Sequence, residues 1–152
     1  PPSETPTFMN DSYTVVVAGS TNRTRQCLEA LLADERFSIS WVLTPVPKPI
    51  GRKHIVSPNP VHQRAQDDGI TSILVEKKID ESIKNQILET CAEKGTPDFL
   101  LVVDFGYLIP SWLLHVPTIS PLNIHPSYLP RWRGSSPART CRCIGRRSGC
   151  GC

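Results

Sequence analysis

Asn123 and His125 are the two side chains whose types and spacing best suit group-transfer chemistry. Residues two apart on an extended strand project from the same face, and Pro126 biases His125 toward extended backbone. An imidazole relays protons near neutral pH, and an amide can donate a hydrogen bond to a developing oxyanion. Taken alone, such a pair is more often structural than catalytic. The residues that follow it shift the balance toward chemistry.

That following segment, residues 127–134, reads S-Y-L-P-R-W-R-G. It combines a rigid proline, two arginines flanking Trp132, and a glycine that permits a tight bend. A tryptophan, which tends to be buried, set between two guanidinium groups beside a histidine is more typical of a binding rim than of a solvated loop. We therefore expect a ligand site here.

The segments upstream alternate short apolar runs with helical patterns. The predicted strands are residues 14–18, 37–44, 70–75, 99–103 and 119–125, and the predicted helices are residues 24–33, 60–68, 80–94 and 110–116. This alternation predicts an α/β domain with a Rossmann-like, doubly wound, mainly parallel sheet, incomplete at its C-terminus. Ligands of such sheets bind beyond the carboxyl ends of the strands, where His125 is expected. Cys27 is expected in the core, on the packed face of the first helix.

Two connections in this scaffold are candidates for function. Residues 45–58 form a long connection with four basic side chains, typical either of a functional loop or of a solvated, mobile one. Residues 104–110, D-F-G-Y-L-I-P, follow the most apolar strand and end at the same sheet edge as His125. This turn either caps the core or borders a ligand.

These motifs together resemble the folate-dependent formyltransferases, and most of all the methionyl-tRNA formyltransferase family. The resemblance lies in N-I-H-P-S-Y-L-P-R-W-R-G-S-S-P, in V-V-V-A-G, P-x-G-R-K and S-P-N-P-V upstream, and in D-F-L-L-V-V-D-F-G-Y-L-I-P. It covers residues 14–137. The fold it implies is the one that the alternation of strands and helices predicts.

The resemblance also implies roles for individual residues. Asn123 would stabilise the oxyanion while His125 assists proton transfer from the amine of methionyl initiator tRNA, and no metal is required. The donor would be 10-formyltetrahydrofolate, bound by two stretches of chain: Phe105, Gly106, Tyr107 and Leu108, and Ser127, Tyr128, Leu129 and Pro130. Arg52 and Lys53 would contact the acceptor end of the tRNA, where phosphate contacts position without reading sequence.

The chain departs from the family pattern in three places. Tyr128 replaces the usual leucine, the family's catalytic aspartate about three dozen residues past the histidine is not within the 152 residues, and neither is the C-terminal tRNA-binding domain. We expect a disordered lead over residues 1–12, a partial catalytic domain over residues 13–137, and an aberrant tail over residues 138–152. The tail holds four cysteines as C-x-C-x6-C-x-C, spaced poorly for zinc, and suggests a reading frame or splice change. Activity is therefore expected to be impaired.

Three alternatives to that function remain to be compared. A formyltransferase for a small amine, such as glycinamide ribonucleotide or an amino sugar nucleotide, shares the histidine motif, and so does a non-catalytic remnant that binds folate or tRNA. A nicotinamide enzyme is disfavoured, because Gly19 stands alone where G-x-G-x-x-G would be needed.

Composition limits the cellular setting and the partners. The net charge of +3 comes from the tail, since four arginines lie there and the remaining 13 basic residues nearly balance 14 acidic ones. No run of eighteen apolar residues occurs, so we expect no membrane association. We expect a monomer, in the mitochondrial matrix if the source is eukaryotic, which we favour, and in the cytoplasm if it is bacterial.

Overall fold

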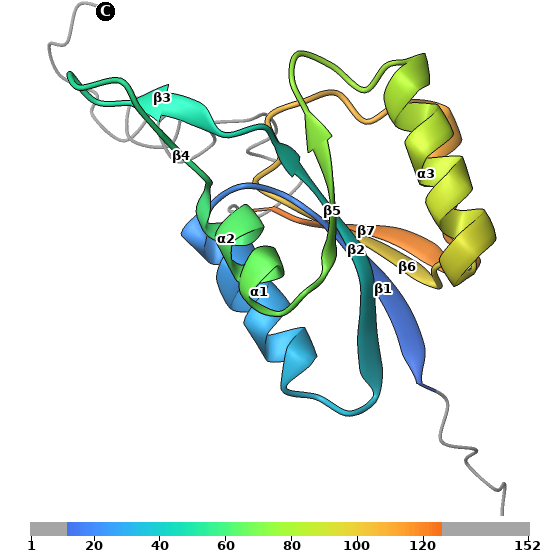
Figure 1. The fold of residues 1–152 in the computed structure, drawn as a ribbon. Helices are drawn as coiled ribbons and strands as arrows, with labels where there is room; N and C mark the ends of the chain where they lie inside the picture. Colours follow the sequence, from blue (N-terminus) through green and yellow to red (C-terminus); the bar gives the residue numbers. More distant parts are fainter. Residues whose placement is uncertain (1–11, 126–152) are drawn as a thin grey trace, which may run out of the picture.

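The computed structural model describes residues 12–125, which form a five-stranded sheet with helices on both faces (Figure 1). The strands are β1 (Tyr13–Ala18), β2 (Phe37–Pro45), β5 (Thr71–Val75), β6 (Phe99–Val103) and β7 (Ser120–Ile124). Their order across the sheet is β5-β2-β1-β6-β7, and each neighbouring pair is parallel. The predicted doubly wound parallel sheet is confirmed, with strand ends within one or two residues of those expected.

The described helices are α1 (Asn22–Leu32), α2 (Pro60–Asp67), α3 (Glu81–Lys94) and the single turn α4 (Ser111–Leu114), and the first three begin after a capping side chain. The side chains of Thr21, Asn59 and Asp80 accept hydrogen bonds from backbone amides in the first turns of α1, α2 and α3. Gly95 ends α3 with a φ of 91°. Helices α1 and α2 lie on one face of the sheet and α3 on the other (Figure 1).

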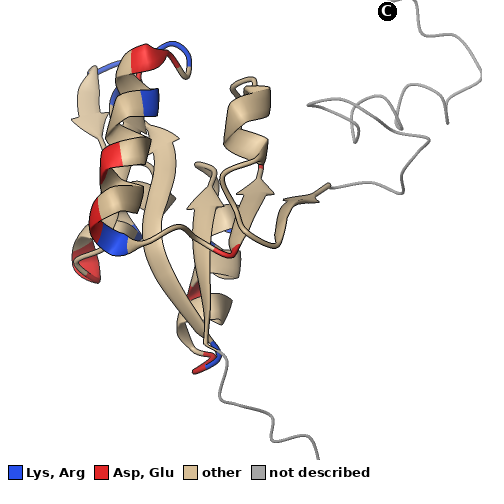
Figure 2. Cartoon of the chain, turned by 90° about the vertical axis from the view of Figure 1, so that its right-hand side faces the viewer, with Lys and Arg blue, Asp and Glu red and all other residues tan. Residues whose placement is uncertain are grey.

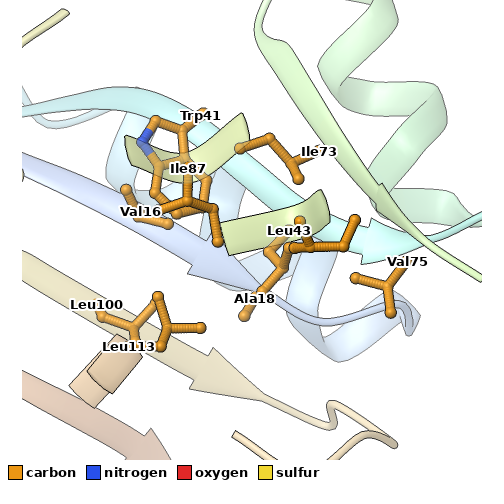
Figure 3. Packing of buried hydrophobic residues seen from close by; sticks show 10 residues of the cluster. Val16, Ala18, Trp41, Leu43, Ile73, Val75, Ile87, Leu100 and Leu113 are labelled. Atoms are coloured by element: carbon orange, nitrogen blue, oxygen red, sulfur yellow. The ribbon is translucent and has the colours of Figure 1, made fainter. Parts of the chain in front are cut away.

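Alternate residues of the strands supply two separate apolar layers. The layer under α3 contains buried Val16, Trp41, Leu43, Ile87 and Leu100, among others (Figure 3). The layer under α1 and α2 is made of Val15, Val17, Leu28, Val42, Val61 and Ala65. This alternation follows from the two-residue period of a strand that is covered on both faces.

The expected core position of Cys27 is not confirmed. Its side chain is half-buried, whereas Thr24 and Leu28 of the same helix are fully buried. The buried stripe of α1 therefore runs through a threonine, which the apolar pattern alone does not reveal. Thr24 can occupy that place because its hydroxyl donates to the carbonyl oxygen of Val103 at 2.7 Å.

Strand order reverses between β1 and β6, because the chain builds outward from β1 to β2 and β5 and then returns through α3 to β6 and β7. Gly19, which follows β1, lies at this switch point. A Cβ atom there would come within 2.1 Å of the Val103 carbonyl oxygen, so the close approach of the two strand ends requires a glycine.

The long basic connection contains regular structure, unlike the unstructured loop considered from the sequence. Strands β3 (Lys48–Ile50) and β4 (Ile55–Ser57) pair antiparallel as a ribbon that extends away from the sheet (Figure 1). Ile50, Ile55 and Val56 are each more than 60% exposed. Because neither face of the ribbon is buried, its sequence carries no alternating pattern from which strands could be predicted.

The exposed face of α3 mixes charges of both signs, as Figure 2 shows. Within residues 12–125 no helix combines the length and apolar character needed to cross a bilayer.

Candidate active site

The predicted catalytic pair lies at the carboxyl edge of the sheet. Asn123 is the fourth residue of β7 and is paired in register with Val102 of β6. His125, predicted as the last residue of the strand, lies one residue past the end of β7. The Asn123 side chain is exposed and His125 is half-buried. The position of the pair is thus confirmed, while its catalytic role stays a prediction.

The predicted folate residues 105–108 lie in the turn after β6, the strand that neighbours β7. The rings of Phe105 and Tyr107 lie 5.4 Å apart, and both pack against the α3-side core layer. Leu108 is 93% exposed, and a Cβ on Gly106 would meet no atom within 4 Å. Two aromatic rings and an exposed aliphatic side chain at a strand end fit a planar heterocycle. The other predicted folate residues, Ser127 to Pro130, lie outside the described residues.

Arg52 and Lys53 occupy the exposed turn between β3 and β4. This turn is tight, with Gly51 at φ 73° and His54 at φ 47°. The predicted tRNA-contacting residues therefore lie at the tip of a ribbon that leaves the carboxyl end of β2, whereas the predicted folate turn follows the carboxyl end of β6, on the other side of β1 (Figure 1).

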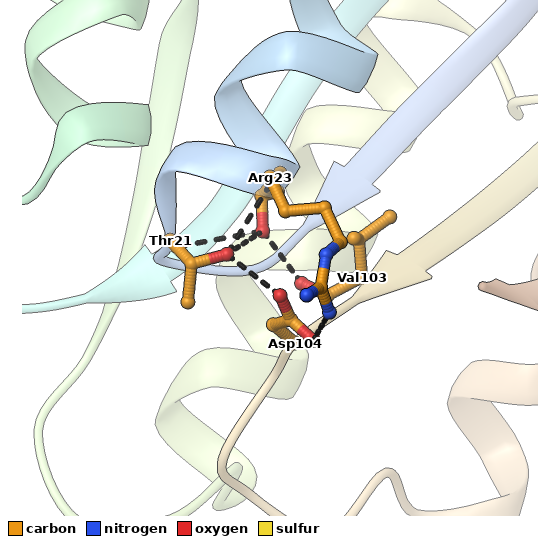
Figure 4. Close-up of polar contacts among 5 residues, drawn as sticks. Thr21, Arg23, Val103 and Asp104 are labelled. Atoms are coloured by element: carbon orange, nitrogen blue, oxygen red, sulfur yellow. Dashed lines mark hydrogen bonds and ion pairs between the residues drawn. The ribbon is translucent and has the colours of Figure 1, made fainter. Parts of the chain in front are cut away.

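A polar network that the sequence did not reveal joins α1 to the end of β6 (Figure 4). The Thr21 hydroxyl donates to Asp104 Oδ2 at 2.9 Å, and Arg23 Nη1 donates to Asp104 Oδ1 at 3.1 Å. Asp104 has a φ of 50°, a conformation that aspartate adopts more readily than most residues. Arg23 and Asp104 thereby form an ion pair at the amino end of α1.

This network occupies the switch point, where doubly wound sheets have their crevice. Asp104 follows β6 as His125 follows β7, so the two residues end neighbouring strands. Both carboxylate oxygens of Asp104 nevertheless bond to α1. A signal for the network exists in the sequence: a Thr-x-x-Thr capping pattern directly after the first strand, and a lone aspartate ending the apolar run 99–103.

Other polar groups in the described part of the chain give no second site. No group of three or more His, Cys, Asp or Glu side chains within residues 12–125 is arranged to hold a metal ion. An apolar crevice lined by Trp41, Leu113 and Pro97, among others, lies toward the amino ends of β6 and β7, away from His125. His62 of α2 is 7% exposed, and burial lowers its pKa.

Comparison with known proteins assigns this arrangement to a class. The formyl transferase family matches residues 13–151, and the chain belongs to that family. Its similar relatives are methionyl-tRNA formyltransferases. The protein from Sulfurovum sp. is 33% identical over 127 residues, covering 84% of this chain and 40% of the relative. The one from Bordetella pertussis is 36% identical over 126 residues, covering 81% and 40%. The chain thus spans about two fifths of the length of the curated relatives it matches.

Solved structures with the same fold have more distant sequences. A phosphoribosylglycinamide formyltransferase from Bacillus halodurans matches with a TM-score of 0.66 and 19% identity, over 88% of this chain and 66% of that one. A formyltetrahydrofolate deformylase from Pseudomonas putida matches with a TM-score of 0.60 and 18% identity, over 90% and 46%. At this identity the likeness establishes the fold.

Proposed function

We propose that this chain carries the formyl-transferring portion of an enzyme that formylates methionyl initiator tRNA, with 10-formyltetrahydrofolate as donor. One observation carries the proposal: relatives bearing that activity in their names share 33 to 36% of residues over four fifths of the chain. The phosphoribosylglycinamide formyltransferases share 16 to 22% and the fold. The exposed basic ribbon supports a polyanionic acceptor.

In the proposed reaction, Asn123 stabilises a negative charge on the formyl oxygen, and His125 removes a proton from the amine. The Asn123 amide donates a hydrogen bond to the oxygen of the formyl group, on which negative charge develops as the amine attacks. His125 takes the proton that the amine loses and passes it to the departing folate nitrogen. Both side chains lie on one strand end, so a single element fixes their spacing.

The donor and acceptor would approach from two sides of this strand end. The turn of Phe105, Gly106, Tyr107 and Leu108 offers apolar contact to the pterin ring. Arg52 and Lys53 would hold phosphates of the acceptor stem and so position it without reading its sequence. The catalytic step itself would then depend on β7.

The test is turnover together with binding, using the full 152-residue chain. We expect formylmethionine to form on charged initiator tRNA supplied with 10-formyltetrahydrofolate, and 5-formyltetrahydrofolate to bind in calorimetric titration. His125→Asn should lower turnover by about 100-fold or more while folate still binds, as loss of a general base does. His115→Asn, an exposed histidine on the α4 side, is the matched control and should keep full turnover.

Three results would contradict the proposal. Formylation of glycinamide ribonucleotide without formylation of the tRNA would favour a small-amine enzyme. Folate binding without any turnover would favour a non-catalytic remnant. Equal loss of turnover in both histidine variants would remove the special role given to His125.

A further inference from the structure

Three segments far apart in the sequence meet at the hydroxyl of Tyr107. Lys48, the first residue of β3, donates from Nζ to Tyr107 Oη at 3.3 Å. Tyr107 in turn donates to the carbonyl oxygen of Glu76, just after β5, at 3.2 Å. A phenol can accept one bond and donate another, so the two contacts are compatible. The start of the ribbon is thereby joined to the turn after β6.

The two sides of this contact differ in how firmly they are held. The Tyr107 ring is half-buried, lies 5.4 Å from the Phe105 ring and packs against the α3-side core layer. Lys48 is exposed, and its ammonium nitrogen also lies 5.9 Å from the Tyr107 ring centroid. Tyr107 is therefore fixed by its packing against the core, and the exposed Lys48 at the start of the ribbon is positioned by its contact with Tyr107.

The ribbon itself has no core to orient it, because none of the residues of β3 and β4 is buried. Its direction depends on contacts where it leaves the sheet. On the returning side, Asn59 Nδ2 donates to Thr44 Oγ1 at 2.8 Å and to the Pro45 carbonyl oxygen at 3.3 Å. On the outgoing side, the described contacts are the bond from Val46 N to the Val75 carbonyl oxygen and the side-chain contact of Lys48 with Tyr107.

We propose that Tyr107 is a positioning residue that fixes the direction of the β3–β4 ribbon, and with it the place of Arg52 and Lys53 relative to the turn after β6. Its hydroxyl and ring face shape an interaction surface for RNA without contributing charge to it. This inference deepens the proposed function, on which its RNA part rests, because the same turn is assigned there to the donor. The positioning itself is a property of the free chain.

The first experiment measures amide hydrogen exchange of the unliganded 152-residue chain by mass spectrometry. In Tyr107→Phe, which keeps the ring but removes both hydroxyl bonds, segment 48–57 should exchange about twofold faster, and in Tyr107→Ala about fivefold faster. Lys48→Met should match Tyr107→Phe. Segment 81–94, which is α3, should not change in Tyr107→Phe or Lys48→Met.

The matched control is Lys94→Met, which removes a similar exposed bond from an ammonium to a hydroxyl, that of Lys94 Nζ to Thr71 Oγ1 at 2.6 Å. It should leave segment 48–57 at the wild-type rate. Because Tyr107→Ala could unfold the chain, the two milder variants decide the matter. Wild-type exchange of segment 48–57 in both of them would overturn the proposal.

The second experiment separates this inference from the function on which it builds. Binding of a short RNA hairpin with the sequence of the initiator acceptor stem is compared in wild-type chain and Tyr107→Phe, which carry the same charge. We expect about threefold weaker binding by the variant. If the wild-type chain binds no RNA, the proposed function fails while the exchange result still stands. Equal binding by both proteins, together with faster exchange in the variant, would overturn the role of Tyr107 in shaping an RNA surface.

Discussion

The hydroxyl of Thr24 donates to the carbonyl oxygen of Val103 at 2.7 Å and thereby joins the first turn of α1 to the last residue of β6. Both side chains are fully buried. The turn that carries Phe105 and Tyr107 starts at the next residue, Asp104, so its starting point is fixed by a contact that belongs to the core. Stability and the geometry of the candidate site are therefore coupled at this point.

Thr24→Val tests that contact, because valine keeps the shape and removes the hydroxyl donor. We expect the free energy of unfolding to fall by about 1–3 kcal/mol, the cost of removing a hydrogen-bond donor from a buried polar group. The measurement is urea denaturation followed by circular dichroism. Thr90→Val removes a bond of the same length and type, to the carbonyl oxygen of Gln86 at 2.7 Å on the exposed side of α3, and should change stability by less than about 0.5 kcal/mol. Equal effects of the two changes would contradict the argument.

Gly19→Ala should be among the most destabilising alanine substitutions in the described chain. The added Cβ would lie 2.1 Å from the Val103 carbonyl oxygen and 2.4 Å from Thr24, so backbone must move. We expect a loss of about 3 kcal/mol, the upper range for overpacking. Gly106→Ala meets no atom within 4 Å and serves as the control in the same thermal denaturation series. A Gly19→Ala protein as stable as the control would show that the strand ends can separate without cost.

His62 should make stability depend on pH near neutrality. Burial lowers its pKa in the folded chain below the ordinary value of about 6.5, so the unfolded chain takes up the proton first as the pH falls. The stabilisation that neutral His62 contributes to the folded chain is fully present above about pH 6.5. It declines as the pH falls from there and levels off below the folded-state pKa of His62.

Denaturation of wild type and His62→Leu from pH 8 to pH 5 checks this, with the exposed His54→Asn as control. The wild-type chain and the control should lose more stability on acidification than His62→Leu does. Parallel pH profiles for all three proteins would rule out His62 as the source.

Replacing Arg52 and Lys53 with alanine should weaken RNA binding by a similar factor for every sequence tested. Each lost phosphate contact should reduce the slope of log K against log salt by about 0.7–0.9. Arg36→Ala, at the amino end of β2 and exposed, removes a cation from the opposite end of the sheet and should leave the slope unchanged. Fluorescence anisotropy at several salt concentrations measures all three proteins. A slope shared by all of them would contradict a phosphate-binding role for the ribbon.

Much of the fold could be predicted because its signals are local. The apolar run Phe99–Val103 gave β6 without error, and α3 begins after Asp80 and ends at Gly95 as its capping residues indicate. The position of His125 followed from Pro126 and the alternation of elements. Each of these depends on a few neighbouring residues, which a single sequence displays.

The parts that were missed depend on contacts over long distances or on surfaces without pattern. Asp104 is held by Thr21 and Arg23, more than 80 residues away, so the apolar run before it marks the end of a strand but not the partners of its carboxylate. The ribbon was read as a loop because exposed strands need no alternation. Helical spacing predicts Cys27 in the core because it counts only apolar residues. It cannot show that the polar Thr24 is buried, since that depends on a hydrogen bond from its hydroxyl to the carbonyl oxygen of Val103.

The ribbon is a self-contained insert in the parallel sheet. Its chain leaves β2 and returns to α2 at nearly the same place, where Thr44 and Asn59 bond side chain to side chain at distances of 2.8 and 3.1 Å. With its ends closed by that pair and no side chain of β3 or β4 in the core, its length and sequence can change without repacking the domain. The ribbon can thus diverge as an exchangeable module, while the ends of β1 and β6 are constrained by the packing of the core.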